Sequence, residues 1–532
     1  MIADPIAAGL QRGWSVRDAS TLDADLHLEA DAVVVGTGAG GATAAETLAR
    51  AGLRVVMIEE GPLQSSRDFH MLEREAYPAL YQESAARKTK DGAITILQGR
   101  AVGGSTVVNW TSSFRAPVRT LAYWREHYGL RDYTPERLSP WYARAERRLS
   151  ITPWSIAPNA NNAVLQRGAA ALGIPTGTMS RNVKGCANLG YCGLGCPTNA
   201  KQSMLVTAIP GALDLGALLV HGARAERFIV EKGRITSLEC AAVFPGGSGS
   251  ARRAIVHAKV YLAAAGGIGT PALLLRSALP DPYGLLGKRT FLHPVVLSAA
   301  LMPEVVAAYA GAPQSVYSDR FLDEYAFEGP AGFKLEVPPV QPLLAAVTMP
   351  GFGTSGARLM AEFAHLQVVL ALLRDGFHEQ SQGGAVELAS DGSPVLDYAI
   401  SPYLWEGMRR AFLAMAEIQF AAGAKRVLPV HESAWPYASW REARTQILAL
   451  PMETLLTRVV SAHVMGGCAM GADPRTAVVD GDGRHHLVEN LYVVDGSVFP
   501  TGLGTNPQLT IYAIADRMAS RLARSLGASS EE

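Results

Sequence analysis

Residues 32–59 read AVVVGTGAGGATAAETLARAGLRVVMIE, and this stretch carries the clearest structural signal in the chain. The apolar run at 32–35 has the length of a buried strand, and a glycine-rich turn at 36–41 follows it directly. Helix formers with apolar residues at helical spacing fill 42–51, and a second buried strand is predicted over 53–58. This unit of strand, turn, helix and strand predicts a parallel sheet of the dinucleotide-binding type.

The glycines of the turn follow the pattern G-x-G-x-x-G, with Gly36, Gly38 and Gly41 at its glycine positions. In a dinucleotide site the first glycine permits the tight turn, and the second lets the backbone approach a pyrophosphate. The third lets the helix pack closely on the strand, while the helix N-terminus faces the phosphate charge. Glu59, at the end of the second strand, is placed to bind ribose hydroxyls, and its charge disfavours a 2′-phosphate. These residues predict a bound dinucleotide and leave FAD and NAD both open.

The composition describes a globular enzyme with more than one lobe. A chain of 532 residues exceeds one ordinary core, and 48% hydrophobic against 18% charged residues excludes a disordered protein. The 48 basic and 48 acidic side chains cancel, so no nucleic-acid partner is expected. The most apolar stretch, 260–275, is interrupted by glycines and a proline, so no transmembrane helix is predicted. Few cysteines and no secretory pattern at the N-terminus predict a cytoplasmic, reducing location.

Three further stretches resemble the glucose–methanol–choline (GMC) oxidoreductases. Residues 99–109, GRAVGGSTVVN, look like the first signature of that family. Residues 265–271 resemble part of the second signature, although 276–278 depart from its usual Ser-Gly pair, and 491–496 resemble the C-terminal flavin segment. The resemblance implies a flavoenzyme of this family and therefore selects FAD over NAD.

The resemblance also assigns residues to the cofactor. In the family, the loop of the first signature crosses the flavin, and in some members a histidine of this loop bonds covalently to it. Val108 occupies that position here and has no atom for such a bond, so non-covalent FAD is implied. The residues expected at the cofactor are Gly36, Gly38, Gly41, Glu59, Gly103, Gly104, Ser105, Asn109, Asp495 and Gly496.

Alcohol oxidation by hydride removal requires a base for the hydroxyl proton and a polar group that orients the oxygen. Residues 461–468, SAHVMGGC, resemble the family segment whose histidine is that base, which implies this role for His463. Asn506 stands where the family places the second polar residue, either asparagine or histidine. His293 also echoes a family stretch, and a structural role at a lobe boundary is expected for it.

The expected fold is α/β, a Rossmann-like FAD-binding domain with an inserted α+β substrate-binding domain built on an antiparallel sheet. Buried-strand patterns at 258–265 and 491–496 and a closing helix at 510–526 belong to the first domain. Between them the sequence becomes β-rich and contains a long amphipathic helix at 402–422. The expected segments are 25–115, 176–286 and 456–532 for the FAD-binding domain, 116–175 for a substrate or lid segment, and 287–455 for the substrate-binding domain.

Three of the five cysteines, Cys186, Cys192 and Cys196, crowd into one glycine-rich loop. A loop with reduced or partly paired thiols is the simplest interpretation. Zinc is disfavoured because three cysteines without a nearby histidine leave the four-ligand set incomplete. An iron–sulfur cluster stays open, since the spacing and the following Pro197 resemble the cysteine run of membrane-linked flavin sugar dehydrogenases. No residue is assigned as a metal ligand.

Residues 195–203 resemble the long-chain (fatty) alcohol oxidase branch of the family. The chain is therefore expected to be an FAD-dependent alcohol oxidase or dehydrogenase. Its expected reaction converts a hydrophobic, long-chain or aromatic, primary alcohol to the aldehyde by proton abstraction and hydride transfer to flavin N5. Apolar stretches at 295–301 and 338–349 fit either a substrate channel or buried strands.

The electron acceptor is left open between oxygen and a quinone or cytochrome. Two alternative functions also stay open. One is an iron–sulfur flavin dehydrogenase subunit that passes electrons to a quinone or cytochrome, and the other is an FAD-containing lyase without net redox chemistry.

Overall fold

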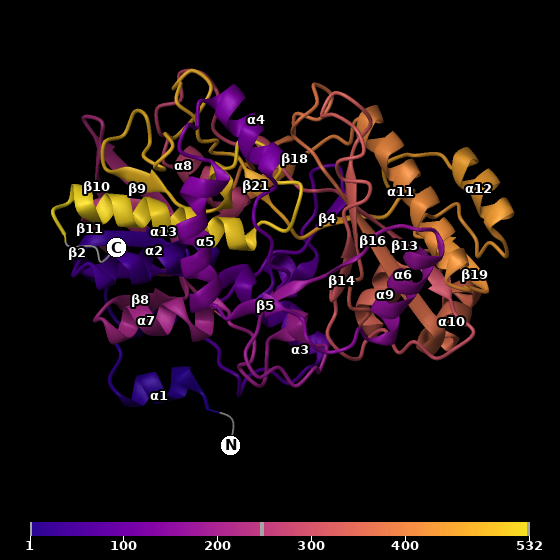
Figure 1. The fold of residues 1–532 in the computed structure, drawn as a ribbon. Helices are drawn as coiled ribbons and strands as arrows, with labels where there is room; N and C mark the ends of the chain where they lie inside the picture. The colour runs from indigo at the N-terminus through magenta and orange to yellow at the C-terminus, as the bar shows by residue number, and fades with distance from the viewer. Residues whose placement is uncertain (1–2, 245–248, 529–532) are drawn as a thin grey trace.

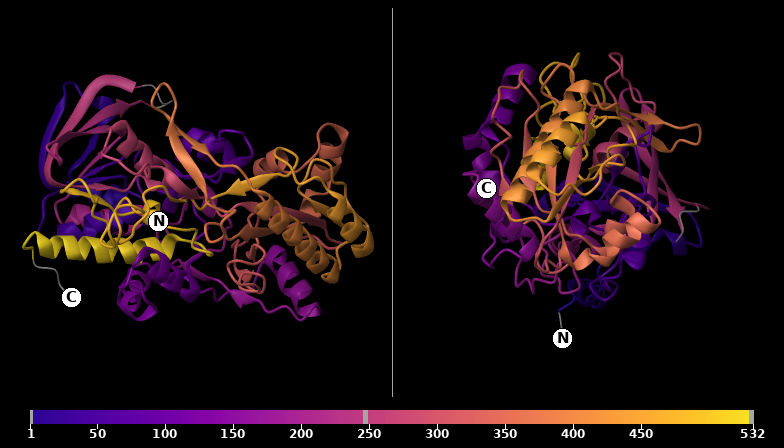
Figure 2. Two further views of the ribbon diagram at one scale, coloured as in Figure 1. Left: turned by 90° about the horizontal axis from the view of Figure 1, so that it is seen from above. Right: turned by 90° about the vertical axis from the view of Figure 1, so that its right-hand side faces the viewer.

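Two eight-stranded sheets, each with its own helices, form the two lobes of the protein, which lie to the left and right in Figure 1. The structure is a computed structural model, and it describes residues 3–244 and 249–528. Seen from above in Figure 2, the lobes lie end to end, and the C-terminal helix runs along the first of them.

The first sheet has the strand order of a dinucleotide-binding fold. Its strands, in order, are β1 (Val16–Asp18), β8 (Leu218–His221), β3 (Val55–Ile58), β2 (Leu26–Val35), β11 (Gly249–Ala263), β10 (Arg234–Val243) and β9 (Ala223–Glu231), and β22 (Leu491–Val493) pairs with the end of β11. Strand β2 runs parallel to β3 and β11, with Ala32 opposite both Val55 and Val260. Helix α2 (Ala39–Arg50) connects β2 to β3, which confirms the predicted unit. The closing helix α13 (Gln508–Ser525) packs against α2.

The second sheet is mainly antiparallel. Its strands, in order, are β4 (Ile94–Ile96), β20 (Val459–Ser461), β13 (Val295–Leu301), β16 (Leu366–Leu373), β15 (Phe333–Glu336), β14 (Val316–Ser318) and β6 (Gly177–Thr178), and β19 (Arg426–Pro429) also pairs with β13. Helix α11 (Pro402–Ala421) packs on β13 and β16, and α6 (Ala160–Ala171) and α12 (Trp440–Ala449) pack on α11. The α/β class with an antiparallel second sheet is therefore confirmed.

Strands β4 and β20 come from segments that the sequence assigns to the FAD-binding domain. In the structure β20 pairs with β4 and with β13, so both strands contribute to the second sheet. The chain thus passes between the lobes more often than the expected segments imply, and the domain boundaries stay a prediction.

A four-stranded sheet near the centre of Figure 1 brings distant segments together. Its strands, in order, are β18 (Pro394–Asp397), β17 (Gly384–Leu388), β12 (Lys288–Phe291) and β21 (Met465–Gly466). Strands β12 and β21 are antiparallel, and Phe291 lies opposite Met465. In an antiparallel pair, the residues that follow Phe291 lie opposite those that precede Met465. Residues 293 and 463 therefore come to adjacent positions.

Neither apolar stretch that fits a substrate channel lines the large cavity described below. Residues 295–301 form β13, and all seven are buried within the second sheet, so the channel interpretation of this stretch is wrong. Residues 338–349 include the surface helix α9 (Pro342–Thr348), on which Leu343 and Val347 are 43% and 63% exposed. The apolar run of β13 reflects a strand covered on both faces.

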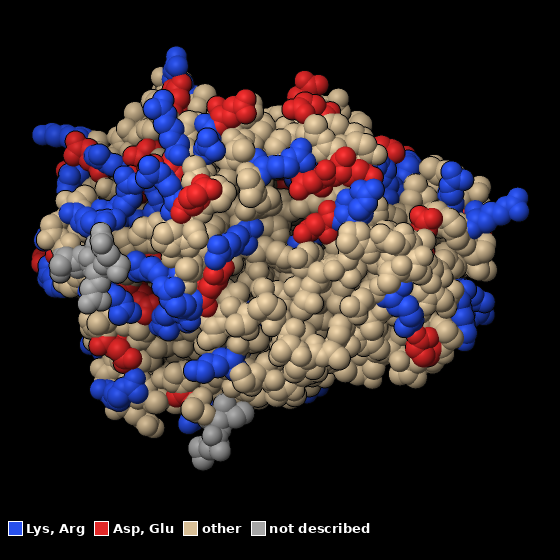
Figure 3. Space-filling model, viewed as in Figure 1, with Lys and Arg blue, Asp and Glu red and all other residues tan. Residues whose placement is uncertain are grey.

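Within residues 3–244 and 249–528, no helix combines the length and the apolar character that crossing a membrane requires. On the face seen in Figure 3, basic side chains are intermixed with acidic ones, most densely over the lobe of the first sheet.

Candidate active site

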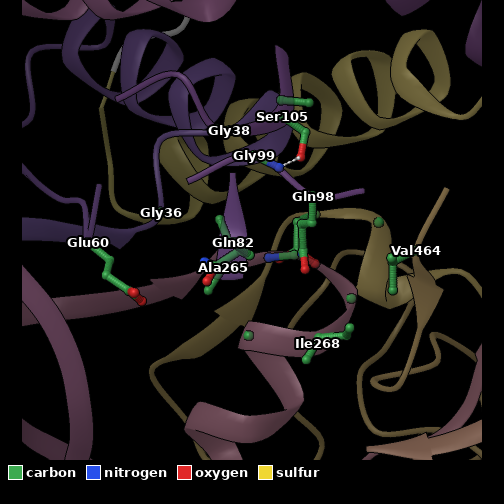
Figure 4. A pocket seen from close by; sticks show the side chains of 18 of the residues that line it. Gly36, Gly38, Glu60, Gln82, Gln98, Gly99, Ser105, Ala265, Ile268 and Val464 are labelled. Carbon is green, nitrogen blue, oxygen red and sulfur yellow. Dashed lines mark hydrogen bonds between the residues drawn. The ribbon is translucent and has the colours of Figure 1, made fainter. Parts of the chain in front are cut away.

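A cavity of about 860 Å³ opens at the carboxyl ends of β2, β3 and β11. Ligands of doubly wound sheets bind at this edge, because the loops and helix N-termini converge there. Figure 4 shows part of the cavity, with Gly36 and Gly38 on one side and Ile268 and Val464 across from them. The predicted residues that line it are Gly36, Gly38, Glu59, Gly104, Ser105, Asn109, His463, Asp495, Gly496 and Asn506, whereas Gly41 and Gly103 lie behind its wall.

The three glycines of the first glycine loop meet different physical requirements. Gly36 has a φ of +96°, and a Cβ there would lie 2.3 Å from the carbonyl oxygen of Ala264. A Cβ on Gly41 would lie 1.9 Å from the carbonyl oxygen of Gly36, so close packing of α2 requires glycine. A Cβ on Gly38 would approach no protein atom closer than 4.0 Å. The space beside Gly38 therefore belongs to the cavity, as a closely approaching ligand requires.

Glu59 holds this loop in place through Thr37. One carboxylate oxygen of Glu59 accepts hydrogen bonds from the Thr37 amide at 3.0 Å and from its hydroxyl at 2.7 Å. The other accepts from the amide of Gly61 at 2.8 Å. Burial raises the pKa of Glu59 above its ordinary value, and these bonds oppose that shift. The acidic residue thus lies at the cavity, and its orientation is fixed by the loop.

The second glycine loop touches the first. Gly104 has a φ of +54°, and a Cβ there would lie 2.8 Å from the Cα of Gly38. Gly103, with a φ of +99°, donates its amide hydrogen to the Thr37 hydroxyl at 2.9 Å. Figure 4 shows the bond from the Gly99 amide to the Ser105 hydroxyl, which is 2.9 Å long. Glycine at positions 103 and 104 therefore lets the two glycine loops pack directly against each other beside the cavity.

Asn109 and Val108 continue this loop along the cavity wall. The Asn109 amide donates to Oε1 of Gln508 at 2.6 Å, while its Oδ1 is buried and has no partner among residues 3–244 and 249–528. A buried acceptor without a donor is costly unless a ligand or water supplies one. The structure thus leaves an acceptor beside the cavity for a group that is not part of the protein.

Asp495 ties β22 to the start of helix α8 (Gly266–Arg276). Its Oδ2 accepts from the Gly266 amide at 2.7 Å and from the Thr270 hydroxyl at 2.6 Å, and its Oδ1 accepts from the Ser497 amide at 2.8 Å. Burial raises the pKa of Asp495. Both carboxylate oxygens therefore already have protein donors, and Gly496 lies beside Asp495 on the cavity wall.

His463 and Asn506 lie side by side, although 43 residues separate them in the chain. Nε2 of His463 is 3.5 Å from Nδ2 of Asn506. Burial, reinforced by the ammonium of Lys334, lowers the pKa of His463 to about 4, so its imidazole is neutral at pH 7. Oδ1 of Asn506 is buried and has no hydrogen-bond partner in the part of the chain that the structure describes. The pair therefore presents a neutral imidazole and a free amide oxygen at one place.

His293 lies against the other edge of His463. The Nδ1 atoms of the two rings are 3.4 Å apart, and the Gly504 amide donates to Nε2 of His293 at 2.9 Å. Burial and the neighbouring His463 lower the pKa of His293 well below its ordinary value. The sequence predicts only a structural role for His293, whereas the structure places it in contact with the proposed base.

Two charged residues behind Asn506 have no counterpart among the predicted site residues. Oε2 of Glu336 accepts from Nδ2 of Asn506 at 3.3 Å, and burial raises the pKa of Glu336 to about 7. Lys334 pairs with Asp319 at 2.9 Å and lies 3.4 Å above the ring of Phe114. Both belong to β15, whose alternating Phe, Lys, Leu and Glu is typical of a half-exposed strand, yet all four side chains are buried.

The three-cysteine loop lies directly behind the cavity wall. Lys201 links the two, since its Nζ donates to the carbonyl oxygens of Val107, Asn109 and Cys192 at 2.5, 2.9 and 2.7 Å. Cys186, Cys192 and Cys196 are half-buried free thiols. The described part of the chain contains no group of three His, Cys, Asp or Glu side chains that could hold a metal ion. An iron–sulfur cluster at this loop stays an alternative for experiment.

Comparisons with known proteins match most of the chain. Two family models described as GMC oxidoreductase match residues 77–295 and 380–515, and an NAD(P)-binding Rossmann-like model matches 34–63. A GMC-type oxidoreductase of Sinorhizobium fredii is 31% identical over 94% of this chain and 95% of the relative. A long-chain-alcohol oxidase of Arabidopsis thaliana is 29% identical over 94% of this chain and 68% of the relative.

Solved structures share the fold. Pyridoxine 4-oxidase from Mesorbium loti superposes with a TM-score of 0.65 at 20% identity, covering 92% of this chain and 98% of that one. Formate oxidase of Aspergillus oryzae superposes with a TM-score of 0.67 at 15% identity, covering 94% and 98%. At these identities the likeness concerns the arrangement of the chain alone.

Proposed function

Because the chain belongs to the GMC oxidoreductase family, as an FAD-dependent oxidoreductase acting on CH–OH groups, we propose that it oxidises a hydrophobic primary alcohol to the aldehyde. The alcohol is long-chain or aromatic. The observation that carries the proposal is the pairing of His463 with Asn506 on the cavity wall. A neutral imidazole beside an unpartnered amide oxygen is what removal of a hydroxyl proton requires.

The residues around the cavity fit FAD, which supplies the hydride acceptor, its N5 atom, when it is bound. We assign the pyrophosphate to the loop of Gly36 and Gly38 at the N-terminus of α2, and the adenosine ribose to Glu59. The open space at Gly38 and the unpartnered Oδ1 of Asn109 support this assignment, since each is complete only with a ligand. Val108, on the same wall, offers no atom for a covalent bond to the flavin.

In the proposed step the neutral imidazole of His463, which lies beside Asn506, accepts the hydroxyl proton. The free Oδ1 of Asn506 orients the substrate oxygen by accepting its hydrogen bond before the proton moves. His293 holds the far edge of the imidazole, and Glu336 holds the amide of Asn506. The protein thus supplies a base and an orienting group, each supported by a buried partner.

Large side chains with apolar faces on the cavity wall support a hydrophobic substrate. Tyr81, Leu97 and Trp110 line the large cavity and also line a small second cavity behind it. The second cavity is otherwise mostly apolar, and its further walls include Tyr77, Leu194, Pro339 and Leu344. Hydrocarbon or aromatic groups suit the apolar faces of these side chains, because contact removes nonpolar surface from water. The resemblance to a long-chain-alcohol oxidase supports the same class.

We propose oxygen as the electron acceptor, because named relatives of this chain are oxidases. A quinone or cytochrome is the competing acceptor. The test adds a long-chain primary alcohol to the purified holoenzyme without oxygen, follows the visible absorbance of the flavin, and then admits air. Bleaching followed by rapid recovery in air is expected. Slow recovery would indicate another acceptor, and a flavin that never bleaches would contradict alcohol oxidation and favour a lyase.

A further inference from the structure

Two buried cations stand beside the three-cysteine loop, and no carboxylate of the described residues pairs with either of them. Arg181 is fully buried, and Lys201 is 2% exposed. Across residues 3–244 and 249–528, every hydrogen bond that either side chain donates ends on a neutral oxygen or on a cysteine sulfur. A buried charge normally requires a partner of opposite charge. The groups that can supply one here are the thiols of the loop.

Arg181 is directed at Cys192. Its Nη2 lies 3.5 Å from the sulfur of Cys192, its Nε donates to the Thr111 hydroxyl at 2.7 Å, and its guanidinium stacks on Trp154 at 4.9 Å. Its Nη1 is buried and has no partner among the residues that the structure describes. The guanidinium is therefore held in place by neighbours on other sides, and one of its donors is left unused.

Cys196 has its own donors. Its sulfur accepts from the Lys201 amide at 3.4 Å and lies 3.5 Å from the Thr198 hydroxyl. Burial alone would raise the pKa of Cys196, but these donors and the Lys201 charge lower it below its ordinary value. Cys186 differs, because burial raises its pKa, and its sulfur accepts from the amide of Asn188. Cationic surroundings favour the thiolate, which is the reactive form of cysteine.

We propose that Cys192 and Cys196 form a peroxide-sensitive thiol pair that closes to a disulfide. The sulfur of Cys192, which faces Arg181, attacks a peroxide oxygen, so that an S–O bond forms, the O–O bond breaks, and the thiol proton leaves with the departing oxygen as water. The Cys196 thiolate then attacks the sulfur of the sulfenic acid, so that the S–S bond forms and a second water leaves. In sum, two thiols lose two electrons, and one hydrogen peroxide becomes two waters.

This pair is coupled to the cavity through the same two cations. Lys201 holds the carbonyl oxygens of Val107 and Asn109, and Arg181 holds the Thr111 hydroxyl and the Trp110 carbonyl. Disulfide formation would change both of the sulfur contacts at these residues, that of Cys192 with Arg181 and that of Cys196 with the Lys201 amide. The proposal therefore includes a change in the wall at 107–111, detectable in the absorbance or fluorescence of bound flavin. It goes beyond alcohol oxidation and does not depend on the substrate.

The test uses the FAD-loaded protein, reduced and freed of reductant without oxygen, with iron and acid-labile sulfide measured first. Hydrogen peroxide at one to a few equivalents is then added, and the remaining thiols are counted and mapped by peptide mass spectrometry. Loss of two of the five thiols is expected, with Cys192 linked to Cys196 and with the flavin spectrum shifted. The buried Cys240 and Cys468 serve as internal controls and should stay reduced.

Two variants sharpen the result. Cys196→Ser removes the second thiol, so a sulfenic acid on Cys192 should accumulate and react with a 1,3-diketone probe. Cys186→Ser is the matched control and should still form the disulfide. A disulfide that includes Cys186, full retention of all thiols in tenfold peroxide, or iron and sulfide bound in stoichiometric amounts would each overturn the proposal.

Discussion

Asn506 donates a hydrogen bond from Nδ2 to Oε2 of Glu336 over 3.3 Å, and both residues are buried beside the proposed base. The other carboxylate oxygen of Glu336 has no partner among the described residues. Burial raises the pKa of Glu336 to about 7, with Lys334 opposing the shift. An ionised carboxylate only accepts hydrogen bonds, so it fixes Nδ2 of Asn506 toward itself and leaves Oδ1 for the substrate.

Replacement of this carboxylate should alter the pH profile of flavin reduction. Below about pH 7 Glu336 is the neutral acid, and above it the carboxylate holds Asn506, so the wild-type rate should rise with pH through this region. Glu336→Gln should lack that rise, because an amide does not titrate. The measurement is the anaerobic reduction rate at pH values from about 5 to 9. The exposed Glu328→Gln is the control, and a retained rise in Glu336→Gln would assign it to another group.

Loss of His463 should remove the proposed base. We expect His463→Ala to slow flavin reduction by about 100-fold or more while FAD stays bound. Because the pKa of His463 is lowered to about 4, the wild-type rate should also fall as the pH drops through about 4, where the imidazole becomes charged. Stopped-flow absorbance measures both effects. The exposed His257→Ala should behave as wild type, and an unchanged rate in His463→Ala would exclude this residue as the base.

Asn506→Ala tests orientation separately from proton removal. Reduction should slow by about tenfold, since the substrate oxygen loses one acceptor and the base remains. The fall in rate near pH 4 should persist, because burial and Lys334 set the pKa of His463. Flavin content, measured by absorbance, should not change. Loss of flavin from this variant would instead indicate that Asn506 holds the cofactor.

Gly38 and Gly36 give a matched pair of alanine variants. Gly38 lacks a positive φ and borders open space, so Gly38→Ala should fold normally and bind FAD at least about tenfold more weakly. Gly36→Ala combines a φ of +96° with a 2.3 Å approach to a backbone oxygen, so it should lower the thermal midpoint or abolish soluble protein. Thermal unfolding and flavin titration separate these effects. Full FAD affinity in Gly38→Ala would contradict the assigned pyrophosphate position.

The flavin should be released intact when the protein is denatured. Val108 stands at the position of the covalent histidine and has only hydrocarbon atoms in its side chain. Acid precipitation should therefore leave all of the FAD in the supernatant and a colourless pellet. Flavin that stays with the washed pellet would show a covalent link through another residue.

Much of the first lobe could be predicted because its determinants are local. The glycine loop, the buried run of β2 and the helix α2 are encoded within 28 consecutive positions, and each residue acts on near neighbours. His463 and Asn506 were accessible through their resemblance to a family pattern. Glu336 and Lys334 were not, because an alternating strand gives the same pattern whether its polar face meets water or a buried network. The contact of His293 with His463 depends on the pairing of β12 with β21, which sequence reasoning did not reach.

The sequence by itself determined the dinucleotide unit, the FAD family and the residue types of the proposed base and its partner. The tertiary structure alone decided which buried charges surround that pair, that β13 is a core strand rather than a channel wall, and that Arg181 and Lys201 face the cysteine loop. The reason is that propensity and periodicity act over a few residues, whereas burial and charge pairing depend on which distant segments meet. These tertiary contacts fix the burial and the neighbouring charges of each side chain, and burial and charge determine its chemistry.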